Sequence, residues 1–151
     1  MKRWPLVGLA ICVFALAGCT PGPGVGPSPT TEVSDEQLLA AFGTLRPGAE
    51  VIASAAGDVS GDGVGDLVVI FAKGDGRNGL LVVLGGDVPS LTNDLPAPAE
   101  NQSITLRDID EAAPTEFTVQ GSKGANIGYA IYRIEDGRLS DLFGEGMEDC
   151  C

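Results

Sequence analysis

The chain has 151 residues, which is enough for one domain with terminal extensions. Its 21 acidic residues outnumber its 9 basic residues, and the resulting net charge of −12 opposes binding to the phosphate backbone of a nucleic acid. The absence of histidine excludes histidine-based catalytic triads and HExxH zinc sites, and 44% hydrophobic residues exclude a disordered acidic chain.

Residues 1–18 have the features of an export signal. Two basic residues precede an apolar stretch at 6–17, which is shorter than the roughly 20 residues of a membrane-spanning helix. The stretch ends in Leu-Ala-Gly-Cys at 16–19, which resembles a bacterial lipobox. This resemblance implies cleavage before Cys19 and attachment of a lipid to its thiol. The alternative is an ordinary signal peptide followed by a chance cysteine.

Residues 19–33 are expected to form a lipidated tether. The sequence TPGPGVGPSPTT at 20–31 contains four prolines and three glycines. This composition forms no helix and buries no apolar surface, so it is typical of a linker. A protein held in this way would be extracytoplasmic and anchored to a membrane by lipid.

The rest of the chain predicts a mainly β domain over residues 34–145. Ser34 and Gln37 fit a capping box, followed by a short helix that ends near Gly43. Glu135-Asp136-Gly137 is typical of a hairpin turn. Alternating and apolar runs predict strands at 51–55, 67–72, 80–84, 103–107, 116–120, 128–134 and 138–143.

A shift of fifty residues aligns two segments without a gap. Asp58-Val59-Ser60 falls on Asp108-Ile109-Asp110, and the acidic residue that begins the next strand is Asp66 in one copy and Glu116 in the other. The alternative is coincidence between two acidic hairpins. A period near fifty suits propeller blades, but two blades cannot close a propeller. We therefore expect two propeller-blade-like antiparallel sheets packed together, with one short N-terminal helix covering an edge.

The first acidic loop, at residues 57–66, predicts a calcium site. Calcium prefers six to eight oxygen ligands, and alternating residues of a curled loop direct their oxygens to one side. The loop resembles the FG-GAP and integrin-type calcium loops, whereas Val69 stands where an EF-hand needs glutamate. The alternative is a solvated Asp/Gly turn. The expected ligands are Asp58, Ser60, Asp62, the backbone carbonyl of Val64, and Asp66.

The second acidic loop, at 108–116, is a weaker copy. Ala112 and Ala113 stand where the first loop has Asp62 and Gly63. One carboxylate and one turn glycine are therefore missing, and we expect no ion in this loop.

The chain ends in Cys150-Cys151, and residues 146–151 are expected to form a mobile acidic dithiol tail. A bridge between adjacent cysteines closes no useful loop, so the pair contributes nothing to stability. Paired thiolates are good ligands for soft metals such as mercury. The acidic neighbours should disfavour thiolate formation until a thiophilic cation displaces the protons. The alternatives are an accidental pair and a disulfide between two molecules.

The lipobox, the Pro/Gly tether, the acidic β domain and the terminal Cys150-Cys151 together resemble the Cys-Cys-COOH (seleno)protein family, SaoC. Some members of this family carry selenocysteine in the terminal pair. The resemblance implies a part in selenocysteine-assisted organometal transport, a system associated with organomercurials and built around an ABC-type transporter. It also implies that Cys150 and Cys151 hold a soft metal or organometal.

The sequence favours a lipid-anchored, calcium-stabilised protein that captures mercury, an organomercurial or another soft metal and passes it to an ABC-type transporter. The alternative is a calcium-dependent interaction module of the cell envelope with an incidental tail. A thiol–disulfide enzyme ranks last, because such enzymes use a CxxC spacing and a lowered thiol pKa. We therefore expect no enzymatic activity, no nucleic-acid partner, and membrane contact through the lipid anchor.

Overall fold

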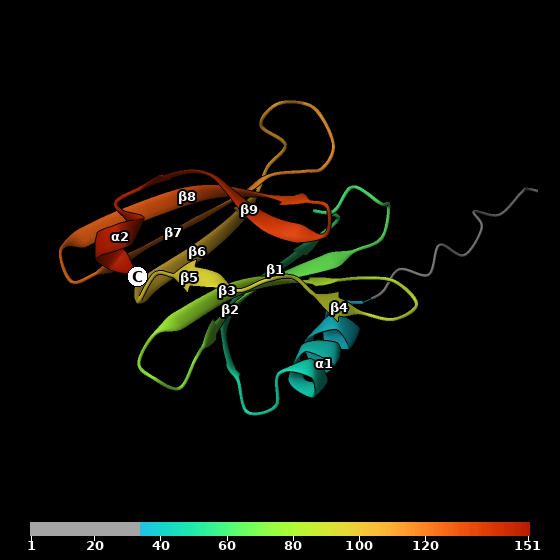
Figure 1. Cartoon of the computed structure of the whole chain (residues 1–151), viewed down its shortest axis with the longest axis horizontal. Coiled ribbons are helices and arrows are strands. Elements are labelled where there is room, and N and C mark those ends of the chain that lie inside the picture. The colour runs from blue at the N-terminus through green and yellow to red at the C-terminus, as the bar shows by residue number, and fades with distance from the viewer. Residues whose placement is uncertain (1–33) are drawn as a thin grey trace, which may run out of the picture. The chain divides into compact units, whose positions relative to one another are not determined.

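The computed structural model describes residues 34–151, which form a mainly β domain of two antiparallel sheets (Figure 1). Helix α1 (Asp35–Leu45) precedes the sheets, and the single-turn helix α2 (Met147–Cys150) follows them. The first sheet contains β1 (Glu50–Gly57), β2 (Asp66–Ala72), β3 (Asn78–Leu84), β4 (Ser90–Leu91) and β5 (Leu95–Ala97). The second contains β6 (Glu100–Leu106), β7 (Phe117–Lys123), β8 (Asn126–Glu135) and β9 (Arg138–Glu145).

All seven strands expected from the sequence are present, together with two short strands, β4 and β5, that were not expected. The second sheet is a simple meander in the order β6-β7-β8-β9. The first has the order β1-β2-β3-β4, with β5 also pairing with β3. Asp136 and Gly137 both have positive φ and form a two-residue turn, which confirms the predicted hairpin between β8 and β9.

Helix α1 begins with the predicted capping box. The Ser34 hydroxyl accepts from the backbone N–H of Gln37, and the Gln37 side chain accepts from the backbone N–H of Ser34. The expectation that this helix covers a sheet edge is wrong. Its buried residues Leu38 and Phe42 pack on the outer face of the first sheet, against Phe71 among others.

Strands β2 and β3 are buried on both faces, which explains their unbroken apolar sequences. Val68 and Ile70 face the second sheet, while Val69 and Phe71 face α1. The main core therefore lies between the sheets and a smaller one lies under the helix. The intersheet core consists of Val59, Val68, Ile70, Leu80, Val82, Ala97, Phe117, Val119, Ala130, Tyr132, Ile134 and Leu139.

Residues related by the fifty-residue shift occupy equivalent places in the two sheets. The Val59 N–H donates to Asp66 Oδ2 at 3.1 Å, and the Ile109 N–H donates to Glu116 Oε2 at 3.0 Å. Asp66 and Glu116 are both buried at the point where a loop becomes a strand. Each carboxylate therefore fastens the loop that precedes it.

The two acidic loops lie side by side at one end of the sheets. Their closeness is seen at Gly61, where an added Cβ would lie 3.3 Å from the Ala113 Cβ. Helix α2 lies at the opposite end, beside the turns that join β2 to β3 and β7 to β8 (Figure 1). Seven residues of β2 separate these ends, about 23 Å at 3.3 Å per residue. The two predicted metal sites thus lie at opposite ends of the domain.

Candidate metal site

The C-terminal residues fold against the domain, so the expectation of a mobile tail is wrong. Gly146 begins α2 in the left-handed conformation, with a φ of 68°. The backbone N–H of Ala99 donates to the Cys150 carbonyl at 2.8 Å, which fixes the last turn to the chain between the sheets. Cys150 is completely buried and Cys151 is half-buried.

Gly128 of β8 makes the docking of α2 possible. A Cβ at this position would lie 2.7 Å from Cys150 Sγ and 2.6 Å from the Gly146 carbonyl oxygen. Both distances are too short for real atoms, so only glycine lets the helix approach the strand this closely.

Three sulfur atoms meet in this turn, and we call Met147, Cys150 and Cys151 the sulfur cluster. Cys150 Sγ lies 3.7 Å from Cys151 Sγ and 3.8 Å from Met147 Sδ. The two cysteines are free thiols, because a disulfide would bring their sulfurs to about 2.0 Å. Two metal–sulfur bonds of about 2.3 Å to atoms at these separations enclose angles of about 107–111°, close to tetrahedral.

The surroundings raise the pKa of the Cys151 thiol well above its ordinary value. Partial burial is the main cause, followed by the hydrogen bond with Cys150 and the charge of that neighbour. Lys123 acts in the opposite direction. The expected direction is therefore confirmed, but its expected cause, the acidic neighbours in the sequence, is not among the causes. Folding also places Lys73 and Arg77 beside Cys151.

A cavity of about 190 Å³ opens next to the sulfur cluster. It is lined by Leu95, Pro96, Tyr132, Asp141, Met147, Glu148 and Cys151. Most of this lining surface is apolar. Such a surface disfavours a hydrated, hard cation and favours a metal or organometal held by soft sulfur atoms. Met147 was not expected from the sequence to join the two cysteines. The spacing of Met147 and Cys150, three residues apart, was the available signal, since residues at i and i+3 share a helix face.

In the predicted calcium loop, Asp66 acts as a buried anchor. Its Oδ2 accepts from the backbone N–H groups of Val59 at 3.1 Å and Ser60 at 2.8 Å. Its Oδ1 accepts from the N–H of Gly85 at 2.9 Å. One carboxylate therefore joins the acidic loop to the end of β3.

Asp58 and Asp62 are exposed and bind the loop's own backbone. Asp58 accepts from the N–H groups of Gly61 at 2.7 Å and Gly63 at 2.9 Å, while Asp62 accepts from the N–H of Val64 at 2.8 Å. Within residues 34–151, neither carboxylate forms an ion pair with a basic side chain. In the described part of the chain, the loop's exposed negative charge is thus left without a protein cation.

The second acidic loop gathers its carboxylates more closely than the first. Asp108, Asp110 and Glu116 bring carboxylate oxygens within 4.8 Å of one another, which the three aspartates of the first loop do not. Arg133 lies among these carboxylates, 3.1 Å from Asp110 Oδ2 and 3.1 Å from Glu116 Oε1. The guanidinium already supplies the cation that such a cluster needs, which favours a structural role over a metal site.

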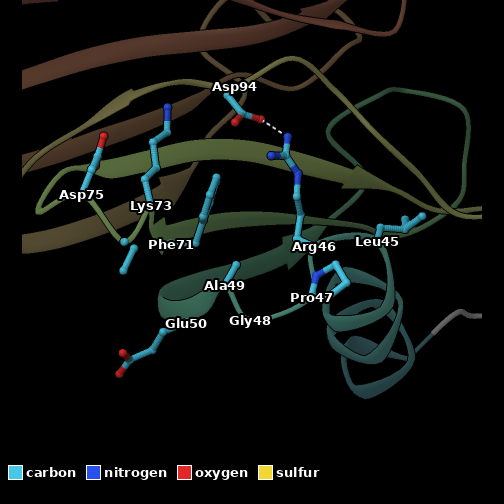
Figure 2. A pocket seen from close by; sticks show the side chains of 12 residues that line it. Leu45, Arg46, Pro47, Gly48, Ala49, Glu50, Phe71, Lys73, Asp75 and Asp94 are labelled. Carbon is cyan, nitrogen blue, oxygen red and sulfur yellow. Dashed lines mark hydrogen bonds and ion pairs between the residues drawn. The ribbon is translucent and has the colours of Figure 1, made fainter.

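An open cleft of about 620 Å³ lies between the end of α1 and the end of β2 (Figure 2). The Arg46 guanidinium pairs with Asp94 and lies 5.7 Å from the centroid of the Phe71 ring. Figure 2 shows Lys73 and Asp75 on the far side of the cleft. Arg46 is occupied in fastening α1 to the sheet, and the lining residues include no group of three carboxylates or thiols close enough to share a metal ion.

Comparison of the chain with protein-family models, curated proteins and solved structures found no match. Within residues 34–151, no helix has the length and apolar character needed to cross a bilayer. The expected signal sequence, Cys19 and the tether lie outside the described residues. Support for a metal site therefore comes from the geometry of the sulfur cluster.

Proposed function

We propose that this protein captures a soft metal or organometal through Cys150 and Cys151. The observation that carries the proposal is the pair of reduced sulfurs, 3.7 Å apart, held in a docked turn beside an apolar cavity. Two thiolates on one ion have a chelate advantage over a single thiolate. Because α2 is docked, the two cysteines are already positioned by folding, and metal binding loses less conformational entropy.

We further propose that the captured metal is mercury or an organomercurial, delivered to an ABC-type transporter by a protein held outside the membrane through lipidated Cys19. This part rests on the resemblance of the lipobox, tether and terminal cysteines to the SaoC family. Transfer would proceed by ligand exchange, since a partner thiolate can replace one thiolate at a time.

Mercury titration of the purified, reduced protein tests the first proposal. We expect one Hg(II) per chain, and we expect Cys150→Ala/Cys151→Ala to abolish this binding. The apparent affinity for Hg(II) should rise with pH, because the ion must displace the thiol protons. The raised pKa of Cys151 keeps that thiol protonated at neutral pH. Asp149→Asn changes the adjacent charge without removing a sulfur and should bind mercury as the wild type does.

Undiminished mercury affinity in the double cysteine variant would end the metal-capture proposal. An interaction module of the cell envelope would then be the better function, with the exposed acidic loops as its surface.

We also propose that the two sheets are propeller-blade-like repeats and that the first loop holds calcium through Asp58, Ser60, Asp62, the Val64 carbonyl and Asp66. The repeat is supported by the equivalent placement of Asp66 and Glu116. The calcium site is supported by a difference in charge compensation between the two loops. The second loop carries Arg133, whereas Asp58 and Asp62 have no basic partner within the described residues.

Calcium removal tests this second proposal. Adding calcium to chelator-treated protein should raise its melting temperature, because an ion bound only by the folded state stabilises that state by mass action. Asp62→Ala should remove most of this rise, while Asp108→Ala in the second loop should leave it in place. Identical melting curves in chelator and in excess calcium would contradict a site in the first loop.

A further inference from the structure

The sulfur cluster contains one more donor than the two cysteines of the proposed function. Met147 Sδ lies 3.8 Å from Cys150 Sγ, about the same separation as that between the two cysteine sulfurs. Met147 and Cys151 also line the same cavity. All three sulfurs are therefore arranged around one small region at the end of the intersheet core.

The spacing of these sulfurs favours an ion with three ligands over an ion with two. Linear coordination with bonds of about 2.3 Å requires donors about 4.6 Å apart, so Cys150 and Cys151 would have to separate by nearly 1 Å. Angles near 107–111° need no such movement and leave room for a third ligand. Two thiolates and a thioether form a soft donor set, and Cu(I) is among the metals that bind such sets.

The charges beside the cluster are mixed. Lys73 and Arg77 line a small pocket with Cys151, while Asp141 and Glu148 line the cavity that Cys151 shares with Met147. Cu(I) with two thiolates and one thioether carries a net charge of −1, and the basic pocket can offset part of it. The choice of metal therefore depends on the soft donor atoms and their spacing.

We propose that Met147 is the third ligand of this site, which binds Cu(I) through the sulfurs of Met147, Cys150 and Cys151. The proposal deepens the proposed function, on which it rests, by naming a third donor and a metal class. Binding is a ligand exchange without redox change. The two thiols release their two protons to solvent, Cu(I) forms two bonds to thiolate sulfur and one to thioether sulfur, and its previous ligands depart.

The test is an anaerobic titration of the reduced protein with Cu(I) in competition with a chromophoric Cu(I) chelator. Met147→Leu keeps the side-chain volume but removes the sulfur. It should lower Cu(I) affinity by about 10–100-fold, the range typical for loss of a group that supports a metal site. It should still bind one Hg(II) per chain, since the two thiolates remain. X-ray absorption should count three sulfurs around copper in the wild type and two in Met147→Leu.

Leu95→Ala is the matched control, because it changes another side chain of the same cavity without removing a sulfur. It should bind Cu(I) as the wild type does. Equal losses in Leu95→Ala and Met147→Leu would overturn the proposal, since the cavity rather than the thioether would then matter. Wild-type Cu(I) affinity in Met147→Leu would also overturn it. Either result leaves mercury capture standing, whereas mercury binding by the double cysteine variant would overturn the proposed function itself.

Discussion

Replacing Asp66 with alanine is expected to destabilise the domain by about 3–5 kcal/mol, because three backbone N–H groups would lose their acceptor. The donors belong to Val59, Ser60 and Gly85, and Val59 is a buried member of the intersheet core. The loss is large against the 5–15 kcal/mol that typically stabilises a domain. Urea unfolding in the presence of a calcium chelator measures this anchoring without any contribution from a bound ion.

Asp62→Ala is the matched control for Asp66→Ala in the same loop. The Asp62 carboxylate is exposed and accepts one hydrogen bond, from the Val64 N–H. Its removal in chelator should cost about 1 kcal/mol or less. Equal losses for the two variants would show that the buried carboxylate of Asp66 does not hold the loop to β3.

Gly128→Ala is expected to displace α2 from the domain. The new Cβ would overlap Cys150 Sγ and the Gly146 carbonyl oxygen, and the short C-terminal turn can move more easily than β8, which is paired on both sides. Overpacking of this kind typically costs about 1–3 kcal/mol. The larger effect should be on Cys150, which is buried in the wild type and would become accessible. Mapping which of Cys150 and Cys151 reacts rapidly with a thiol reagent checks this: of these two, Cys151 alone should react in the wild type, and both should react in the variant.

Gly144→Ala is the matched control for Gly128→Ala, since it also lies on the second sheet and faces α2. A Cβ at Gly144 would lie 3.6 Å from Met147 Cγ and 3.5 Å from the Ala130 Cβ, which are ordinary contacts. This variant should keep Cys150 protected. Protection of Cys150 in Gly128→Ala as well would mean that the strand, not the turn, adjusts to the added methyl group.

Local patterns in the sequence were sufficient to predict most of the secondary structure. The capping box at Ser34, the apolar runs of β2 and β3, and the Asp136-Gly137 turn depend on neighbours within a few residues. Their physical causes are side-chain periodicity and backbone dihedral preference, both of which can be read from consecutive residues. The fifty-residue shift likewise aligns Asp66 with Glu116, which accept equivalent hydrogen bonds from Val59 and Ile109.

Only the tertiary structure decided how the two ends of the molecule are built. The docking of α2 depends on the missing side chain of Gly128, and Arg133 reaches the second acidic loop from β8. Lys73 and Lys123 approach Cys151 from separate parts of the chain and add basic neighbours to the acidic ones that the adjacent residues suggested. Such contacts join residues far apart in the chain, and packing and charge act through space. The sequence alone therefore determined which residues have sulfur and carboxylate chemistry, while folding decided which neighbours each of them has.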